Sequence, residues 1–293
     1  TTEKDASFTI SSQSGGADAI QKSPPSDGWT KRQADYCCSP MMAHSGAGRP
    51  AARCRRGILH PMYARHFGLS QSPFSIAPDP RYLFMSERHA EALAHLLYGV
   101  RESGGFIQLT GEVGTGKTTL VRSLLQQLPD SVDVALILNP QLSRTEFLCA
   151  ICEELHVPLP EARGSIKALI DALNQFLLEN HSRGRRTILI VDEAQNLRPD
   201  VLEQVRLLTN LETTKQKLLQ IILIGQPELR DLLSRNDMRQ LAQRITGRYH
   251  LEPLSREEAE AYIDHRVRVA GGVGRIFADG SRHEIFRLGR GIP

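Results

Sequence analysis

The sequence predicts an α/β fold in which a parallel sheet lies between two layers of helices. Two apolar runs, at residues 187–191 and 218–224, are continuous rather than alternating, which is typical of strands that are buried on both faces. Amphipathic helical patterns separate these runs, as crossovers between parallel strands require. A third apolar run, 106–110, leads through a glycine-rich turn into another helical pattern. These three observations predict a three-layer core.

The composition limits the class of protein. The chain has 293 residues, of which 40% are apolar and 24% are charged, and its net charge is +3. Residues 1–61 hold 8 Lys and Arg against 5 Asp and Glu, which leaves 28 residues of each sign in residues 62–293. Net charge therefore gives no argument for a nucleic-acid partner. The longest apolar run is far shorter than the roughly 18 residues of a membrane-spanning helix, so we expect no span.

The cysteines favour a reducing, cytoplasmic setting. Five cysteines are too few and too scattered for a disulfide framework. Cys149 and Cys152 have the spacing C-x-x-C, but they lie inside an apolar helical pattern with no second pair near them. We therefore expect two small side chains that face the core, rather than a redox or metal site.

The N-terminal third divides into three segments. Residues 1–61 are rich in Ser, Gly, Pro, Ala and Arg and have no sustained periodicity, so we expect a disordered leader ahead of a start at Met62. Aromatic residues are interleaved with prolines over 63–84, which predicts an extended, ordered arm across the domain instead of a helix. Ser86 then caps an amphipathic helix that precedes the strand at 106–110.

The turn after this strand has the pattern G-x-x-x-x-G-K-[ST] in the strand–turn–helix context of a phosphate loop. Its glycines allow backbone N–H groups to point at a phosphate chain, and the following helix adds its positive end. Lys117 is expected on the β- and γ-phosphates of ATP, and the Thr118 hydroxyl on a Mg²⁺ ion. The alternative is a glycine-rich turn without a ligand. The residues expected to bind the nucleotide are Gly111, Glu112, Val113, Gly114, Thr115, Gly116, Lys117, Thr118 and Thr119.

A pair of acidic residues forms the second candidate group. After a strand at 132–138 and two helical segments, the apolar run 187–191 leads directly into Asp192 and Glu193. An aspartate at the carboxyl end of a buried strand near the phosphate loop can hold Mg²⁺, and the adjacent glutamate can polarise the attacking water. The alternative is that the two acids cap the next helix.

The next strand, 218–224, ends at a third candidate. Gln226 follows it and is expected to sense the γ-phosphate and the attacking water, the alternative being a turn residue ahead of a helix that starts at Pro227. A short strand is expected at 249–251, and a capping box at Ser255 opens a helical subdomain. The expected domains are a nucleotide-binding core at 62–253 and a partial lid at 254–293.

Five stretches together resemble a known family. They are YARHFGLSQSPFSIAPDPRYLF (63–84), GEVGTGKTT (111–119), LIVDEAQ (189–195), LIGQPEL (223–229) and LAQRITGRYHLEPLS (241–255). Residues 62–293 are similar to the AAA+ ATPase domain of the general secretion pathway protein A (ExeA-like) family, and to its relatives in exopolysaccharide and pilus loci. The resemblance implies a five-stranded parallel core of the P-loop NTPase type, a helical lid, and ATP bound between neighbouring subunits of a ring-like oligomer.

The resemblance also implies that an arginine of the neighbouring subunit completes the site. By its position after the sensor strand, Arg244 is the expected arginine finger, with Arg248 second; the alternative is an arginine on a solvated helix face. The sequence stops at Gly291-Ile-Pro293, where family members continue with an arginine and the rest of the lid. Secretion members also continue into a transmembrane helix and a periplasmic part. We therefore expect a fragment, in which the second sensor residue cannot be assigned.

These inferences predict an ATPase that converts ATP and water to ADP and phosphate. We expect it to drive assembly or remodelling of a secretion or export partner of the cell envelope, in the cytoplasm at the inner face of the inner membrane. One alternative is a transposition-type AAA+ regulator that coats DNA, which the neutral core does not favour. A second alternative is a nucleotide-gated adaptor without turnover, but the intact Asp192–Glu193 pair argues against it. A third alternative is a purely structural domain.

Overall fold

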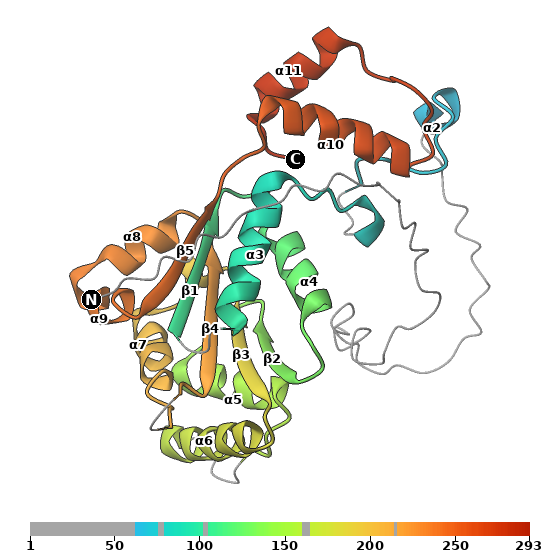
Figure 1. Ribbon diagram of the computed structural model, residues 1–293. Helices are drawn as coiled ribbons and strands as arrows, with labels where there is room; N and C mark the ends of the chain where they lie inside the picture. The colour runs from blue at the N-terminus through green and yellow to red at the C-terminus, as the bar shows by residue number, and fades with distance from the viewer. Residues whose placement is uncertain (1–61, 76–78, 102–104, 160–164, 214–215) are drawn as a thin grey trace, which may run out of the picture. The chain divides into compact units, whose positions relative to one another are not determined.

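The computed structural model describes residues 62–75, 79–101, 105–159, 165–213 and 216–293 (Figure 1). The leader expected at 1–61 lies outside these residues.

The described residues form a five-stranded parallel sheet with the strand order β2-β3-β4-β1-β5. The strands are β1 (Gly105–Gly111), β2 (Val132–Ile137), β3 (Arg186–Val191), β4 (Leu219–Gly225) and β5 (Ile245–Leu251). Since β4 lies between β1 and β3, the carboxyl ends of these three strands meet at one edge of the sheet. The five-stranded parallel core that the family resemblance implies is confirmed.

Strand β5 begins four residues earlier than the expected strand at 249–251. It pairs with β1 alone, in a register that joins Ile245 to Phe106 and Leu251 to Gly111. At the edge of the sheet its residues Thr246 and Arg248 face solvent. Because Thr246, Gly247 and Arg248 follow the single buried Ile245, the first half of the strand has no apolar run that could reveal it in the sequence.

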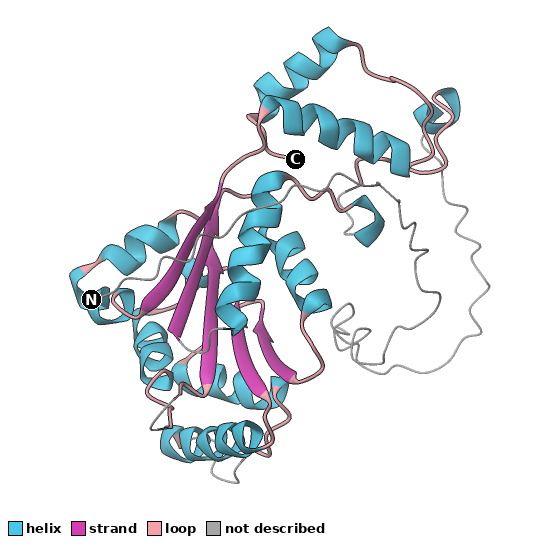
Figure 2. Ribbon diagram, viewed as in Figure 1, coloured by secondary structure: helices cyan, strands magenta, loops and turns pink. Residues whose placement is uncertain are grey.

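Helices cover both faces of the sheet (Figure 2). One face packs against α5 (Arg144–Glu154), α6 (Ile166–Ser182), α7 (Pro199–Leu208) and α8 (Glu228–Ser234), and the other against α3 (Glu87–Arg101) and α4 (Lys117–Gln127). Along β3, Leu189 and Val191 join the first hydrophobic cluster, whereas Ile188 and Ile190 join the second. Since side chains alternate along a strand, burial of all four explains the continuous apolar run. The predicted three layers are confirmed.

The C-x-x-C pair lies on α5 and faces the core, as expected. Cys152 is fully buried in the first cluster, and the half-buried Cys149 packs against it. Burial raises the pKa of the Cys152 thiol to about 11. Such a thiol is protonated at neutral pH, which argues against a reactive or metal-binding role.

Two helices, α10 (Arg256–Val269) and α11 (Asp279–Gly289), form what we call the lid. The buried Arg282 of α11 donates two hydrogen bonds to the Asp264 carboxylate of α10, at 2.8 Å and 2.5 Å. A bidentate pair with one buried partner fixes the angle between two helices more firmly than an exposed ion pair does. The two helices are therefore joined by this pair as well as by packing.

The N-terminal arm differs in part from the expected extended segment. It begins with the short helix α2 (Met62–His66) and includes a 3₁₀ turn, η1 (Pro80–Tyr82). Its apolar side chains pack on α10, where Leu69 and Tyr82 join Val267. Arg266 of α10 also lies over the Tyr82 ring, 4.4 Å from its centroid. The described part of the arm is thus ordered, but the lid holds it, because the lid supplies apolar partners that a proline-rich segment lacks within itself.

Within the described ranges, no helix is long and apolar enough to cross a bilayer. The same residues contain no group of three His, Cys, Asp or Glu side chains that could hold a metal ion. A Mg²⁺ ion bound through one carboxylate, one hydroxyl and the phosphates of a substrate needs no such group.

Candidate nucleotide-binding site

The expected phosphate loop joins β1 to α4. Gly114 and Gly116 have φ values of +86° and +93°, which residues with a β-carbon rarely adopt. A β-carbon on Gly111 would lie 2.7 Å from the Leu251 carbonyl oxygen, so the end of β5 passes too close for any side chain there. The glycines of the motif therefore meet two demands, positive φ angles and close approach of the backbone.

Lys117 is the first residue of α4, and its side chain turns back over the loop. Its Nζ donates hydrogen bonds to the carbonyl oxygens of Gly111 and Glu112, both at 2.8 Å. Burial lowers the pKa of the Lys117 ammonium, while Glu193 and Asp192 oppose this effect. The ammonium is thus held among groups that it can exchange for phosphate oxygens.

Asp192 and Thr118 face one another, although they come from different elements. The Thr118 hydroxyl, on α4, donates to Asp192 Oδ2 at the end of β3, over 3.4 Å. Burial raises the pKa of the Asp192 carboxyl, and the bond from the backbone N–H of Glu193 to Oδ1 opposes this rise. A hydroxyl and a carboxylate at this separation are the hard oxygen donors that Mg²⁺ prefers, so the two residues fit the metal.

Glu193 stands at the next position in an unusual backbone conformation. Its φ and ψ angles are 50° and 38°, in the left-handed region that is costly for a residue with a side chain. Its Oε2 accepts hydrogen bonds from Nε2 of Gln226 at 3.2 Å and of Gln195 at 2.6 Å. The structure thus brings Glu193 and Gln226 together, as the sequence analysis expects, while the backbone of Gln226 also takes part in the first turn of α8.

Gln195 is a residue of this site that the sequence reasoning missed. Besides donating to Glu193, its Oε1 accepts the backbone N–H of Gln226 at 3.0 Å, so one amide joins the ends of β3 and β4. A β-carbon on Gly225 would lie 2.6 Å from that Oε1. Its position two residues after Glu193 was a possible signal, because a tight turn there returns the side chain to the sheet edge.

The two candidate arginines lie away from the loop of their own chain. The backbone of Arg244 is bonded to Phe106, at the start of β1, whereas the phosphate loop follows the end of β1. The Arg244 side chain donates to the Arg206 carbonyl at 3.2 Å, to Asn210 Oδ1 at 2.7 Å and to the Thr209 hydroxyl, all at the C-terminal end of α7. Arg248 is exposed and donates to the Ala242 carbonyl. Neither arginine belongs to the group around Lys117 and Glu193.

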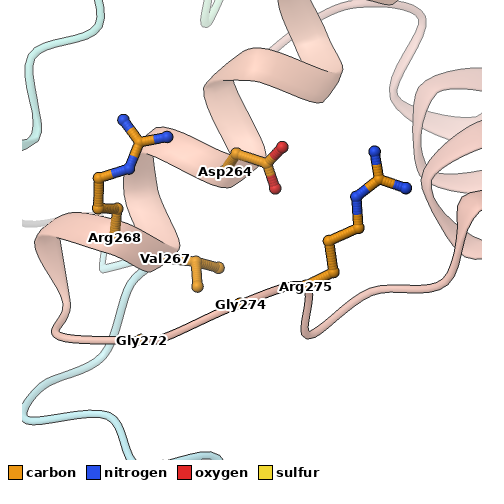
Figure 3. Close-up of a pocket in the computed structure, with 6 residues that line it drawn as sticks. All are labelled: Asp264, Val267, Arg268, Gly272, Gly274 and Arg275. Atoms are coloured by element: carbon orange, nitrogen blue, oxygen red, sulfur yellow. The ribbon is translucent and has the colours of Figure 1, made fainter.

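A separate hollow lies in the lid, between α10 and the loop after it (Figure 3). Its lining residues are Asp264, Val267, Arg268, Gly272, Gly274 and Arg275. Two of its charged groups already have partners, because Asp264 is bound by Arg282 and Arg275 pairs with Asp279. It shares no residue with the phosphate loop, so we do not assign the nucleotide to it.

Comparison with known proteins shows what the chain is similar to. A model of the AAA domain family matches residues 100–233. General secretion pathway protein A of Aeromonas hydrophila is 56% identical over 232 residues, which are 79% of this chain and 42% of that protein. The chain therefore spans less than half the length of this relative.

Solved structures share the fold at low sequence identity. The Drosophila ORC bound to DNA has a TM-score of 0.57 and 21% identity, over 88% of this chain and 61% of that one. The Walker-type ATPase PABY2304 of Pyrococcus abyssi has a TM-score of 0.54 and 19% identity, over 76% of this chain and 68% of that one. At these identities the likeness concerns the fold.

Proposed function

Because this chain belongs to the AAA+ P-loop NTPases and is homologous to general secretion pathway protein A, we propose that it binds and hydrolyses ATP in the presence of Mg²⁺. One observation carries the proposal. The Lys117 ammonium, the Thr118–Asp192 pair and the Glu193–Gln226 pair gather at one edge of the sheet, although they come from three separate strand ends. Phosphate binding, metal binding and activation of water each need one of these groups.

The residues divide the work as follows. The N–H groups of the loop and the N-terminus of α4 bind the phosphates, and Lys117 exchanges its carbonyl partners for phosphate oxygens. Thr118 and Asp192 would hold Mg²⁺, which when bound would neutralise charge on the phosphates. Glu193 takes a proton from the attacking water, while Gln226 orients that water or the γ-phosphate.

We further propose that the site is completed by a second subunit. The side chains of Arg244 and Arg248 bind carbonyl and side-chain oxygens outside the phosphate loop of their own chain, so the proposal gives the arginine at the γ-phosphate to a neighbour. A ring-like homo-oligomer supplies such a neighbour at every site. Arg244 remains our first choice for this arginine and Arg248 the second.

The proposed biological role is inferred from the name of the relative that is 56% identical to this chain. General secretion pathway protein A is named for secretion, so we propose that this module couples ATP turnover to assembly or remodelling of secretion or export proteins of the cell envelope. Its expected place is the cytoplasm, at the inner face of the inner membrane. A DNA-coating regulator and an adaptor without turnover are the rival functions, and the experiment below separates them.

The test is ATP turnover measured over a range of protein concentrations, with and without duplex DNA. We expect Mg²⁺-dependent turnover that rises more steeply than protein concentration and does not need DNA. Lys117→Ala should lose binding of a fluorescent nucleotide, and Glu193→Gln should bind ATP without hydrolysing it. Turnover that requires DNA would favour the regulator, and binding without turnover at any concentration would favour the adaptor. Unchanged binding by Lys117→Ala would exclude the phosphate-loop assignment.

A further inference from the structure

One buried histidine stands directly behind the phosphate loop, and the proposed mechanism does not use it. His89 lies on α3 with 5% of its surface exposed. Its Nε2 is 2.8 Å from the carbonyl oxygen of Thr115, and its Nδ1 is 2.7 Å from the Ser86 hydroxyl. Since a carbonyl oxygen can only accept, Nε2 carries a hydrogen and donates it to the loop. The ring thus joins the start of α3 to the middle of the phosphate loop.

This contact fixes the direction of one peptide group. In a planar trans peptide the C=O of one residue and the N–H of the next point in opposite directions. His89 holds the Thr115 carbonyl toward α3, so the N–H of Gly116 points away from α3. A phosphate loop works by directing such N–H groups at the phosphates.

The loop and the ring also fit one another closely. A β-carbon on Gly116 would lie 2.8 Å from His89 Nε2, so the glycine is needed for this approach as well as for its φ angle of +93°. The His89 side chain is itself held in place by Ser86. Ser86 is buried, accepts the backbone N–H of His89, and begins α3 through the bond from Ala90 to its carbonyl. Two residues earlier, Phe84 packs against the ring of Tyr262 in the lid.

We propose that His89 is a positioning residue of the phosphate loop, which orients the Gly116 N–H toward the nucleotide without contacting the nucleotide itself. The inference rests on the proposed binding of ATP at this loop. It accounts for a buried histidine that donates to a loop carbonyl, a position where most buried side chains would be apolar.

The sharpest test compares two side chains of the same length at position 89. In His89→Gln the amide nitrogen can take the place of Nε2 and donate to Thr115, whereas His89→Met fills similar space but has no donor. We expect His89→Met to weaken the affinity for a fluorescent ATP analogue by about five- to tenfold, the worth of one hydrogen bond. The affinity of His89→Gln should stay within about twofold of the wild type, by the same reasoning. The exposed His95, on the same helix, supplies the control variant His95→Gln, with no expected effect.

Melting temperatures of all variants show whether an effect is specific to the loop. If the Gln and Met variants bind nucleotide equally well, or lose affinity equally, the positioning role is refuted. If His89→Met does not fold, His89→Asn takes its place in the comparison with His89→Gln. The shorter amide of asparagine is expected to reach Ser86 but not Thr115. The wild type and Lys117→Ala are titrated in parallel. A wild type that does not bind nucleotide would refute the proposed function instead, so the two failures can be told apart.

Discussion

The proposal that Arg244 completes the site of a neighbouring subunit makes a quantitative prediction. The Arg244 carbonyl accepts the N–H of Phe106, and the loop begins five residues further along β1, at Gly111. At a rise of about 3.3 Å per residue, the two are separated by about 16 Å along the strand. The side chain also turns toward α7 rather than along the sheet. Arg244 can therefore serve a γ-phosphate only in another copy of the chain.

Two different magnitudes follow for Arg244→Ala. If the residue serves only to bind the end of α7, the variant loses three hydrogen bonds from a charged donor, which are worth about 1.5–3 kcal/mol each at most, so stability falls while turnover changes little. If it is an arginine finger, turnover falls by about 10³–10⁵ while nucleotide affinity stays nearly intact. A Thr209→Val variant removes the hydrogen bond between Arg244 and Thr209, and the bond from the Thr209 hydroxyl to the Arg206 carbonyl, but keeps the arginine charge. It shows how turnover responds when the end of α7 is loosened and the arginine stays.

Mixing two inactive variants gives the decisive assay. A Glu193→Gln subunit keeps its finger, and an Arg244→Ala subunit keeps its base. In an equimolar mixture with random assembly, about one interface in four combines the intact base with the intact finger. Activity should thus return to about a quarter of the wild-type value, and only at concentrations where subunits associate.

Assembly must be shown by sedimentation with ATP in the same samples. If the mixed oligomers form and no activity returns, Arg244 is not the finger, and the exchange is repeated with Arg248→Ala. Recovery with Arg248→Ala alone would transfer the role to that residue. If neither mixture recovers activity, the shared site itself is refuted.

Two further predictions concern the site edge and the core. Gln195→Ala should lower kcat by about 10- to 100-fold with little change in KM for ATP, because the hydrogen bonds of Gln195 hold Glu193 and the backbone of Gln226. Equal changes in kcat and KM would contradict this role, and Gln175→Ala on the exposed face of α6 is the control. Cys152, with a pKa of about 11, should resist alkylation at pH 8 in the folded protein and react after unfolding, as peptide mass spectrometry can follow. Because the folded-state pKa is raised above the unfolded value of about 8.5, its contribution to stability should be lost as pH rises from about 9 through 11, a trend that Cys152→Ala should lack.

The groups that the sequence determined by itself are those whose members are adjacent in the chain. Gly111 to Thr119 form one turn and the start of the helix after it, and Asp192 and Glu193 follow one buried strand. Residues that are neighbours in the sequence are therefore also neighbours in space at these two places. The same holds for the three layers, because burial on both faces leaves a continuous apolar run such as 187–191. The family resemblance supplied the five strands and the expectation of a shared site.

Other features depend on contacts between residues far apart in the sequence. β4 lies between β1 and β3, and this order alone brings Gln226 to Glu193. The first half of β5 has no continuous apolar run, so the length of this strand could be recognised only from its pairing with β1. The sequence predicts that the arm is ordered, but it does not show that the arm packs on α10.

For some residues the sequence shows the element they belong to but not the partners of their side chains. Gln195 was part of a quoted motif, and His89 belonged to a predicted helix, yet neither had a role until folding placed it. His89 and Thr115 are 26 residues apart, and Arg244 meets the end of α7 across 34 to 38. A local pattern records which face of a helix or strand is buried, because that depends on neighbours three or four positions away. The partner of each polar side chain is decided by how whole elements pack, which only the tertiary structure contains.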